Sequence, residues 1–334
     1  MLLRERPLLA DGIDADLYVP RAVGDVLLEA ALADRNTLLV GEPGSGKTTL
    51  LRWLRARLRD AGRRCAFVNA SLASDVFSFA DLVADGLEEA WPPESRPLSP
   101  PFKSGDALPR TVRLLYEVRR LETSEPLVVL VDGLTDSAVA HDWFGRLRDE
   151  LWALGHTWVV ATRPVDAGAF RAPPADAFWS LVLEVPRLSV PEREAMLERG
   201  LRSDERELVD EAALPPDPTP RELVGLLRAL TSRSNGSSEP GDIQAWWRER
   251  RERAAALGQP EQRALAELEA IGRPVSAHDS DLLRRLEWSR PYAQRVLARL
   301  EDAGLVRVVP ERTTGQGRPR KLYELSPLPR PEWE

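Results

Sequence analysis

Short apolar runs alternate with amphipathic stretches along the first half of the chain. The runs are rich in β-branched residues and short enough to be buried strands, and they occupy residues 37–41, 65–69, 127–132, 158–162 and 181–185. Stretches with helical spacing separate most of them, at residues 48–60, 76–90, 108–121 and 138–154. Buried strands that alternate with helices are typical of a parallel sheet covered on both faces, so we expect an α/β domain.

The pattern changes in the second half of the chain. Two amphipathic stretches, at residues 190–201 and 220–230, predict helices of a small bundle. A linker rich in Ser and Gly follows at residues 231–241, and another predicted helix spans residues 243–257. Within the first half, the proline-rich residues 91–110 predict a long surface loop, which is either an insertion near an active site or a tolerated excursion.

The C-terminal part predicts three helices followed by two paired strands. The helices cover residues 260–271, 280–286 and 289–303, and Gly304 ends the third. The two strands are expected at residues 305–309 and 321–325. The chain therefore divides into a core at 1–186, a helical lid at 187–235, a linker with a connecting helix at 236–256 and a small α+β domain at 257–327.

Composition excludes several classes of protein. With 43% hydrophobic and 30% charged residues, the 334-residue chain is typical of soluble globular proteins. It has no apolar run near the roughly 18 residues of a membrane span and no N-terminal signal-peptide pattern, so we expect no membrane partner. One cysteine, Cys65, excludes an internal disulfide, and with three histidines a zinc site is not expected. These features favour the cytoplasm.

The net charge of −7 is unevenly distributed. Residues 257–325 carry twelve Lys/Arg and ten Asp/Glu, a net of +2, so the rest of the chain is acidic. Only the C-terminal domain is therefore a candidate for nucleic-acid binding, although a balance of +2 is also unremarkable for a domain that binds none.

One motif points to nucleotide chemistry. The sequence Gly41-x-x-x-x-Gly46-Lys47-Thr48 matches the phosphate-loop pattern, and it follows a predicted strand and opens a predicted helix. Backbone N–H groups of such a loop surround a phosphate, Lys47 bridges the β- and γ-phosphates, and the Thr48 hydroxyl binds Mg²⁺. We therefore predict ATP with Mg²⁺, bound by Gly41, Pro43, Gly44, Ser45, Gly46, Lys47, Thr48 and Thr49.

A second Mg²⁺ ligand is expected at the end of another buried strand, and Asp132 fits this position. The next residue is Gly133 rather than the Glu that a fast ATPase places there. The stretch Asp132-Gly-Leu-Thr-Asp136 resembles the Asp-Gly-Leu-Asp-Glu signature of the STAND and NACHT branch of AAA+-related ATPases. This resemblance implies that Asp136 orients the attacking water and that hydrolysis is weak; the alternative is an ordinary surface Asp.

Three further segments support the same resemblance. Thr162 and Arg163 end the fourth strand, where the family has a group that senses the γ-phosphate, although Arg163 could equally pair with an acidic neighbour. Leu17-Tyr-Val-Pro-Arg21 is similar to the N-terminal box that covers the adenine. Thr219-Pro-Arg-Glu-Leu223 resembles the lid segment of STAND and origin-recognition ATPases, which implies that Arg221 reaches the nucleotide when the lid closes.

The C-terminal domain resembles a winged helix-turn-helix of the MarR type, through its stretch Ala-Arg-Leu-Glu-Asp-Ala-Gly-Leu-Val. In such folds the third helix enters the major groove of double-stranded DNA and the wing contacts phosphates. The resemblance implies DNA contacts from Ser289, Arg290, Tyr292, Gln294, Arg295, Arg299, Arg312, Arg318, Arg320 and Lys321. Winged helices also bind proteins or pack on the ATPase as an autoinhibitory lid, so this alternative stays open.

The leading interpretation is an ATP-dependent switch that binds DNA, with self-assembly into a nucleotide-dependent homo-oligomer as a further expectation. A second interpretation is a signalling or scaffold ATPase whose winged helix binds a protein partner. A third is a motor such as a helicase or loader, but we find no additional motor motif in the sequence.

Overall fold

The computed structural model describes residues 2–3, 7–9, 14–71, 73–90, 111–112, 115, 126–206, 209, 214, 217–231, 253, 256–271, 274–286, 288–310 and 321–325. The chain divides into two compact units, each described below by itself. One comprises Leu2–Leu201 and Asp217–Leu223, and the other comprises Arg202–Pro216 and Val224–Glu334 together with the first residue. The bounds of the four segments expected from the sequence stay predictions.

The first unit is built on a five-stranded parallel sheet, which confirms the predicted α/β class. Its strands are ordered β2-β3-β4-β1-β5. The first strand therefore lies in the interior of the sheet, between β4 and β5. Their bounds are β1 Thr37–Val40, β2 Cys65–Asn69, β3 Val128–Asp132, β4 Thr157–Thr162 and β5 Leu181–Glu184. Because the strands are parallel, the carboxyl ends of all five lie at one edge of the sheet, where ligands of such folds bind.

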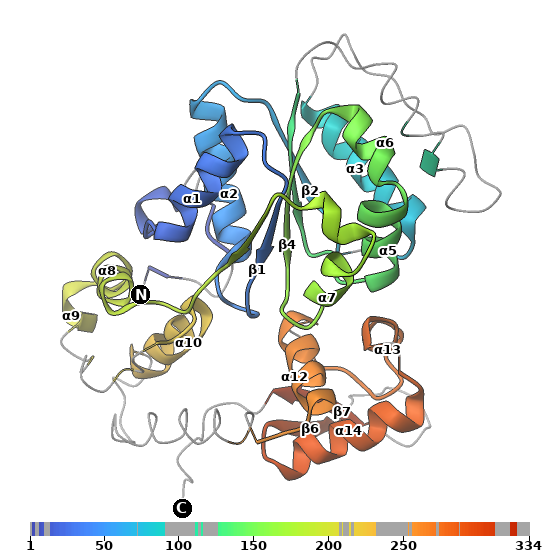
Figure 1. Cartoon of the computed structure of the whole chain (residues 1–334). Helices are drawn as coiled ribbons and strands as arrows, with labels where there is room; N and C mark the ends of the chain where they lie inside the picture. Colours follow the sequence, from blue (N-terminus) through green and yellow to red (C-terminus); the bar gives the residue numbers. More distant parts are fainter. Residues whose placement is uncertain are drawn as a thin grey trace, which may run out of the picture. The chain divides into compact units, whose positions relative to one another are not determined.

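Two helices cover one face of the sheet (Figure 1). They are α1, Ala22–Leu32, and α2, Lys47–Asp60, and a short 3-10 helix at Ala15–Leu17 precedes them. Leu51, Leu54 and Leu58 of α2 are fully buried against this face, as the helical spacing predicts. This packing fixes the start of α2 at the edge of the sheet where β1 ends.

The other face is covered by α3, Val76–Ala90, and by the helices that follow β3 and β4 (Figure 1). The sequence predicts one continuous helix at 138–154, and this is wrong in detail. The structure has α5 at Ser137–His141, a π-helical turn at Asp142–Arg146 and α6 at Arg148–Leu154. The wider turn lets the neighbours Trp143 and Phe144 both enter the core, where neither is exposed. After β4 come α7, Ala167–Arg171, and a 3-10 helix at Ala175–Phe178.

Short helices follow β5. They are α8, Val190–Gly200, α9, Ser203–Arg206, and α10, Pro220–Thr231. Ser189 and Glu192 form a capping box at the start of α8. The predicted proline-rich loop at 91–110, the linker beyond Thr231 and nearly all of the helix expected at 243–257 lie outside the described residues. Within the part of the chain that the structure describes, no helix has the length and apolarity that crossing a membrane requires.

The second unit contains an α+β arrangement at its C-terminal end. Its helices are α12, Gln259–Ile271, α13, Ser280–Leu286, and α14, Arg290–Asp302. The strands β6, Val306–Pro310, and β7, Lys321–Leu325, pair antiparallel. An isolated bridge joins Val275 to Tyr323 of β7, a pairing that the sequence analysis missed. Leu282, Leu297 and Leu300 lie in the core shared by these helices and strands.

Candidate nucleotide-binding site

The loop between β1 and α2 has the backbone of a phosphate cradle. Gly44 and Gly46 have φ angles of +81° and +95°, which a residue with a Cβ rarely adopts. Gly46 is the N-cap of α2, so the first N–H groups of this helix are directed into the loop. The hydroxyl of Ser45 is buried and has no hydrogen-bond partner among the described residues. Together these features give the loop donors for an anion.

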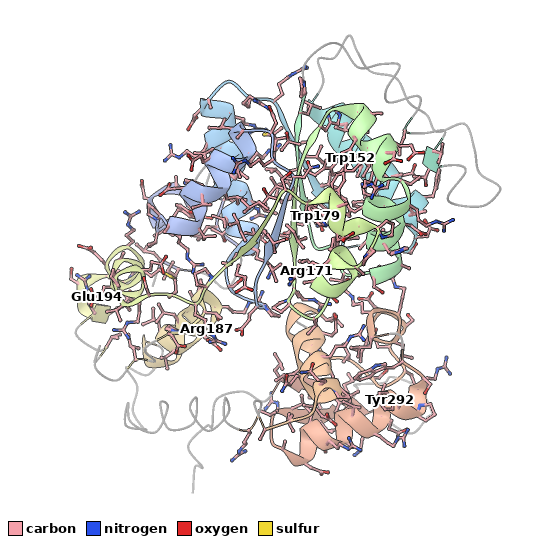
Figure 2. All side chains as sticks on the ribbon, in the orientation of Figure 1. Trp152, Arg171, Trp179, Arg187, Glu194 and Tyr292 are labelled. Atoms are coloured by element: carbon pink, nitrogen blue, oxygen red, sulfur yellow. The ribbon has the colours of Figure 1, made fainter. Side chains whose placement is uncertain are left out.

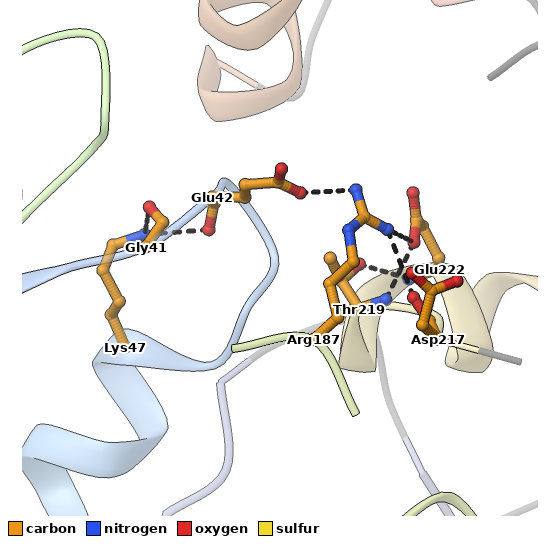
Figure 3. Close-up of polar contacts among 7 residues, drawn as sticks. All are labelled: Gly41, Glu42, Lys47, Arg187, Asp217, Thr219 and Glu222. Atoms are coloured by element: carbon orange, nitrogen blue, oxygen red, sulfur yellow. Dashed lines mark hydrogen bonds and ion pairs between the residues drawn. The ribbon is translucent and has the colours of Figure 1, made fainter. Parts of the chain in front are cut away.

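Lys47 is held along the loop by two backbone carbonyls. Its Nζ donates to the carbonyl oxygens of Gly41 at 2.7 Å and Glu42 at 2.9 Å (Figure 3). Burial lowers the pKa of Lys47 to about 8, and the Asp132 carboxylate acts in the opposite direction. A phosphate would replace the two carbonyls with charged acceptors, which bind an ammonium more strongly.

The two predicted Mg²⁺ ligands meet. The Thr48 hydroxyl, at the start of α2, donates a 2.6 Å hydrogen bond to Oδ2 of Asp132, the last residue of β3. Burial raises the pKa of Asp132, while the Thr48 hydrogen bond and Lys47 lower it. A hydroxyl and one carboxylate are oxygen donors that suit Mg²⁺, which completes its shell with phosphates and water. The described residues contain no cluster of three or more His, Cys, Asp or Glu that could hold a metal ion.

The end of β4 lies beside the loop, because the N–H of Gly41 donates to the Thr162 carbonyl at 3.2 Å. The Thr162 side chain is 2% exposed, and its hydroxyl has no hydrogen-bond partner in the described part of the chain. Arg163 is buried too, and its Nε donates to Oδ2 of Asp166 at 2.5 Å. The ion pair that the sequence left open for Arg163 is therefore present, and whether Thr162 or Arg163 senses the γ-phosphate stays a prediction.

Asp136 is the N-cap of α5. Its Oδ1 accepts hydrogen bonds from the backbone N–H groups of Ala138 at 2.9 Å and Val139 at 3.0 Å. This is a local structural role that the sequence analysis did not assign to it. Whether Asp136 also orients water stays a prediction.

Arg21 and Thr49 were both expected to bind the cofactor, and in the structure both contact other parts of the protein, so their role in binding stays a prediction. Arg21 is 8% exposed and donates to the Ser45 carbonyl at 2.8 Å and to the Pro186 carbonyl at 2.5 Å. The hydroxyl of Thr49 accepts a 3.2 Å hydrogen bond from the N–H of Leu8. Arg21 thus supports the loop through the Ser45 carbonyl, and Thr49 holds the N-terminal segment around Leu8 on α2.

The first turn of α10 contacts the loop from another side. The N–H of Arg221 donates to the Gly44 carbonyl at 3.3 Å. A Cβ at Gly44 would lie only 2.7 Å from the Cβ of Arg221, so the two backbones approach as closely as a glycine permits. Whether the Arg221 side chain reaches a nucleotide stays a prediction.

An ion-pair chain that the sequence pattern does not predict lies next to the loop. Arg187 donates to the carboxylate of Glu42 at 2.5 Å and to that of Glu222 at 2.9 Å, and Glu222 also accepts from the Thr219 N–H (Figure 3). In the sequence, only Glu42 indicates such a pair, because a carboxylate inside an anion-binding loop is stabilised by a nearby cation.

In the second unit, the residues predicted to contact DNA have different surroundings. Arg290, Gln294 and Arg295 are exposed on α14, and Ser289 is its N-cap. Tyr292, which Figure 2 labels, is half-buried. Its ring packs edge-on against that of Trp288. Arg299 pairs with Glu261 at 2.7 Å, and Lys321 pairs with Glu301 at 3.8 Å. The predicted contacts Arg312, Arg318 and Arg320 lie outside the described residues.

Comparison with known proteins agrees with this geometry. Residues 32–148 match the family model of the AAA domain. The fold is similar to that of the ORC1 protein of Aeropyrum pernix in a complex with DNA, at 18% identity and a TM-score of 0.50, covering 93% of this chain and 90% of that one.

Two weaker similarities are to Cdc6p of Pyrobaculum aerophilum and to AMPPCP-bound DnaA of Aquifex aeolicus. The first has 16% identity and a TM-score of 0.47, and covers 95% of each chain. The second has 12% identity and a TM-score of 0.39, and covers 87% of this chain and 92% of that one. No curated protein matches the sequence. The family match and the geometry of the loop together show that the chain contains an AAA-type P-loop ATPase domain.

Proposed function

We propose that the protein is a switch that binds ATP with Mg²⁺ and hydrolyses it slowly. The observation that carries this proposal is the 2.6 Å contact between Thr48 and Asp132, directly beside Lys47. Thr48 and Asp132 would hold the ion, which supplies positive charge to the phosphates. Lys47 binds the β- and γ-phosphates, and the backbone around Gly44 and Gly46 donates to them.

Slow turnover is proposed from the residues around Asp132. The position after it is Gly133, with a φ of +77°, so no carboxylate follows the ligand directly. Asp136 uses one oxygen to cap α5, and we propose that it orients water with the other. The buried Thr162 hydroxyl, with no partner in the described structure, is proposed to sense the γ-phosphate.

The position of α10 supports a lid that responds to the nucleotide. Arg221 lies on the loop at Gly44, and we propose that its side chain reaches the phosphates, as the resemblance to STAND and origin-recognition ATPases implies. A ligand shifts such a lid only by its difference in affinity for the two positions. ATP and ADP must therefore differ in their contacts with Arg221 or Thr162.

DNA is proposed as the partner of the C-terminal unit. Support comes from the element order, which is α12, the bridge at Val275, α13, α14 and the β6–β7 pair, as in a winged helix. Exposed Arg290 and Arg295 on α14 are suited to a major groove or its phosphates. The similar Aeropyrum pernix protein was solved in complex with DNA.

Binding of labelled duplex DNA across a salt series, measured by fluorescence anisotropy, tests this part. We expect salt-sensitive binding that differs between ADP and a non-hydrolysable ATP analogue. The double variant Arg290→Gln with Arg295→Gln should weaken it, whereas Arg146→Gln, a surface arginine of the other unit, should not. Absence of binding with either nucleotide would remove DNA as the partner.

One observation favours a second candidate, in which the winged helix binds a protein. Two of the cations predicted to contact DNA already pair with acids of the same unit, Arg299 with Glu261 and Lys321 with Glu301. Sizing chromatography with each nucleotide, with and without DNA, separates these candidates and also tests the proposed homo-oligomer. The cytoplasmic location stays a prediction.

A further inference from the structure

Arg187 lies between the phosphate loop and α10 and is held there from both sides. Its Nη2 donates to the Glu42 carboxylate at 2.5 Å and its Nη1 to the Glu222 carboxylate at 2.9 Å (Figure 3). The neighbouring backbone is fixed as well, because the Val185 N–H donates to Val40 at 2.7 Å and the Leu188 N–H to Pro218 at 2.9 Å. The guanidinium is therefore a positioned group rather than a free surface cation.

The carboxylate of Glu42 is an unfavourable neighbour for a phosphate. Glu42 follows the first glycine of the loop, and its carbonyl accepts from Lys47 at 2.9 Å. Its charge also reaches this ammonium, since it is among the groups that raise the pKa of Lys47. An unpaired carboxylate here would repel a polyphosphate, and a triphosphate more than a diphosphate because it carries more charge. The half-exposed pair with Arg187 removes most of this repulsion.

The second contact of Arg187 extends to the lid. Glu222 accepts from the Thr219 N–H at 2.8 Å, and the Thr219 hydroxyl accepts from the Glu222 N–H at 3.2 Å. This reciprocal pair caps the helix turn that places Arg221 on Gly44. The chain Glu42–Arg187–Glu222 therefore joins the loop to the first turn of α10.

We propose that Arg187 is a positioning residue for the nucleotide, which neutralises Glu42 beside the phosphate loop and so favours a triphosphate over a diphosphate. Glu222 holds the guanidinium in place for this role. The inference rests on the nucleotide binding proposed above and adds the residue that sets the preference between the two nucleotides.

The test measures the Kd of fluorescent ATP and ADP analogues, with Mg²⁺, for the full chain and three variants. Arg187→Gln should raise the triphosphate Kd by roughly three- to tenfold, and the diphosphate Kd by less, since exposed ion pairs contribute modestly. Glu42→Gln alone should not weaken binding. The double variant Arg187→Gln with Glu42→Gln should recover most of the lost affinity, because the charge that Arg187 neutralises is gone.

Arg146→Gln is the matched control, because Arg146 also forms an exposed ion pair, with Asp142, in the same unit. It should change neither Kd, and melting curves of all variants show whether any of them unfolds. A double variant as weak as Arg187→Gln would overturn the proposal, as would a single variant with unchanged affinities. If the unmodified chain binds neither analogue, the proposed function itself fails. If the unmodified chain binds and the double variant stays as weak as Arg187→Gln, only the role of Arg187 fails.

Discussion

The Thr48 hydroxyl donates to the Asp132 carboxylate at 2.6 Å across a separation of 84 residues. Thr48 lies in the first turn of α2, Asp132 is the last residue of β3, and β4 lies between β3 and β1 in the sheet. The contact therefore requires β1, β4 and β3 to be in register. It brings a hydroxyl and a carboxylate together at the strand ends where such folds bind ligands.

Asp132→Asn should remove the dependence of nucleotide affinity on Mg²⁺. Asn keeps the shape of the side chain and can still accept from Thr48, but it lacks the charge that a divalent cation needs. We expect nucleotide titrations with Mg²⁺ and with EDTA to become superimposable, and turnover to fall by about 100-fold or more. Persisting stimulation by Mg²⁺ would place the metal ligand elsewhere.

Lys47→Ala should raise the ATP Kd by about 100-fold, because two charge-assisted hydrogen bonds to phosphate are lost. Calorimetric titration measures this directly. The protein should stay folded, since Lys47 bonds only to loop carbonyls in the absence of phosphate. Tight ATP binding by a folded variant would refute the assignment of the site.

Gly44→Ala should affect both stability and the lid. A left-handed φ of +81° costs an alanine about 1–2 kcal/mol, and its Cβ would also meet the Arg221 Cβ. Gly155→Ala is the matched control, since its φ is +71° and nothing lies within 4 Å of an added Cβ. Chemical denaturation should show a loss in both variants. Only Gly44→Ala should also reduce nucleotide affinity, and equal affinities would argue against contact between α10 and the occupied loop.

Two variants of Asp136 separate its observed role from its proposed one. Asn is a good N-cap, whereas Ala is expected to cost about 1 kcal/mol of stability at the start of α5. If Asp136 orients water, steady-state ATP turnover should fall in both variants while nucleotide binding is kept. Normal turnover by Asp136→Asn would show that Asp136 is only a helix cap.

The parts of the site that could be predicted are those with local signals. The loop was found because its glycines, lysine and threonine are consecutive and sit between an apolar strand and an amphipathic helix. Asp132 was found because it ends a buried run. For Arg163 the sequence left sensing and ion pairing open, and only the packed structure shows that Asp166, three residues on, takes its Nε.

The sequence by itself determined the parallel α/β fold, the five strands and the phosphate loop, because hydrophobic period and backbone-permissive glycines act over a few residues. The tertiary structure alone decided what surrounds the loop. It assigned Arg21 to the Ser45 carbonyl and placed Arg187 between Glu42 and Glu222, partners separated by 24, 145 and 35 residues. Such pairs leave no periodic trace in the sequence, since their geometry arises only when β5 and α10 pack beside the loop.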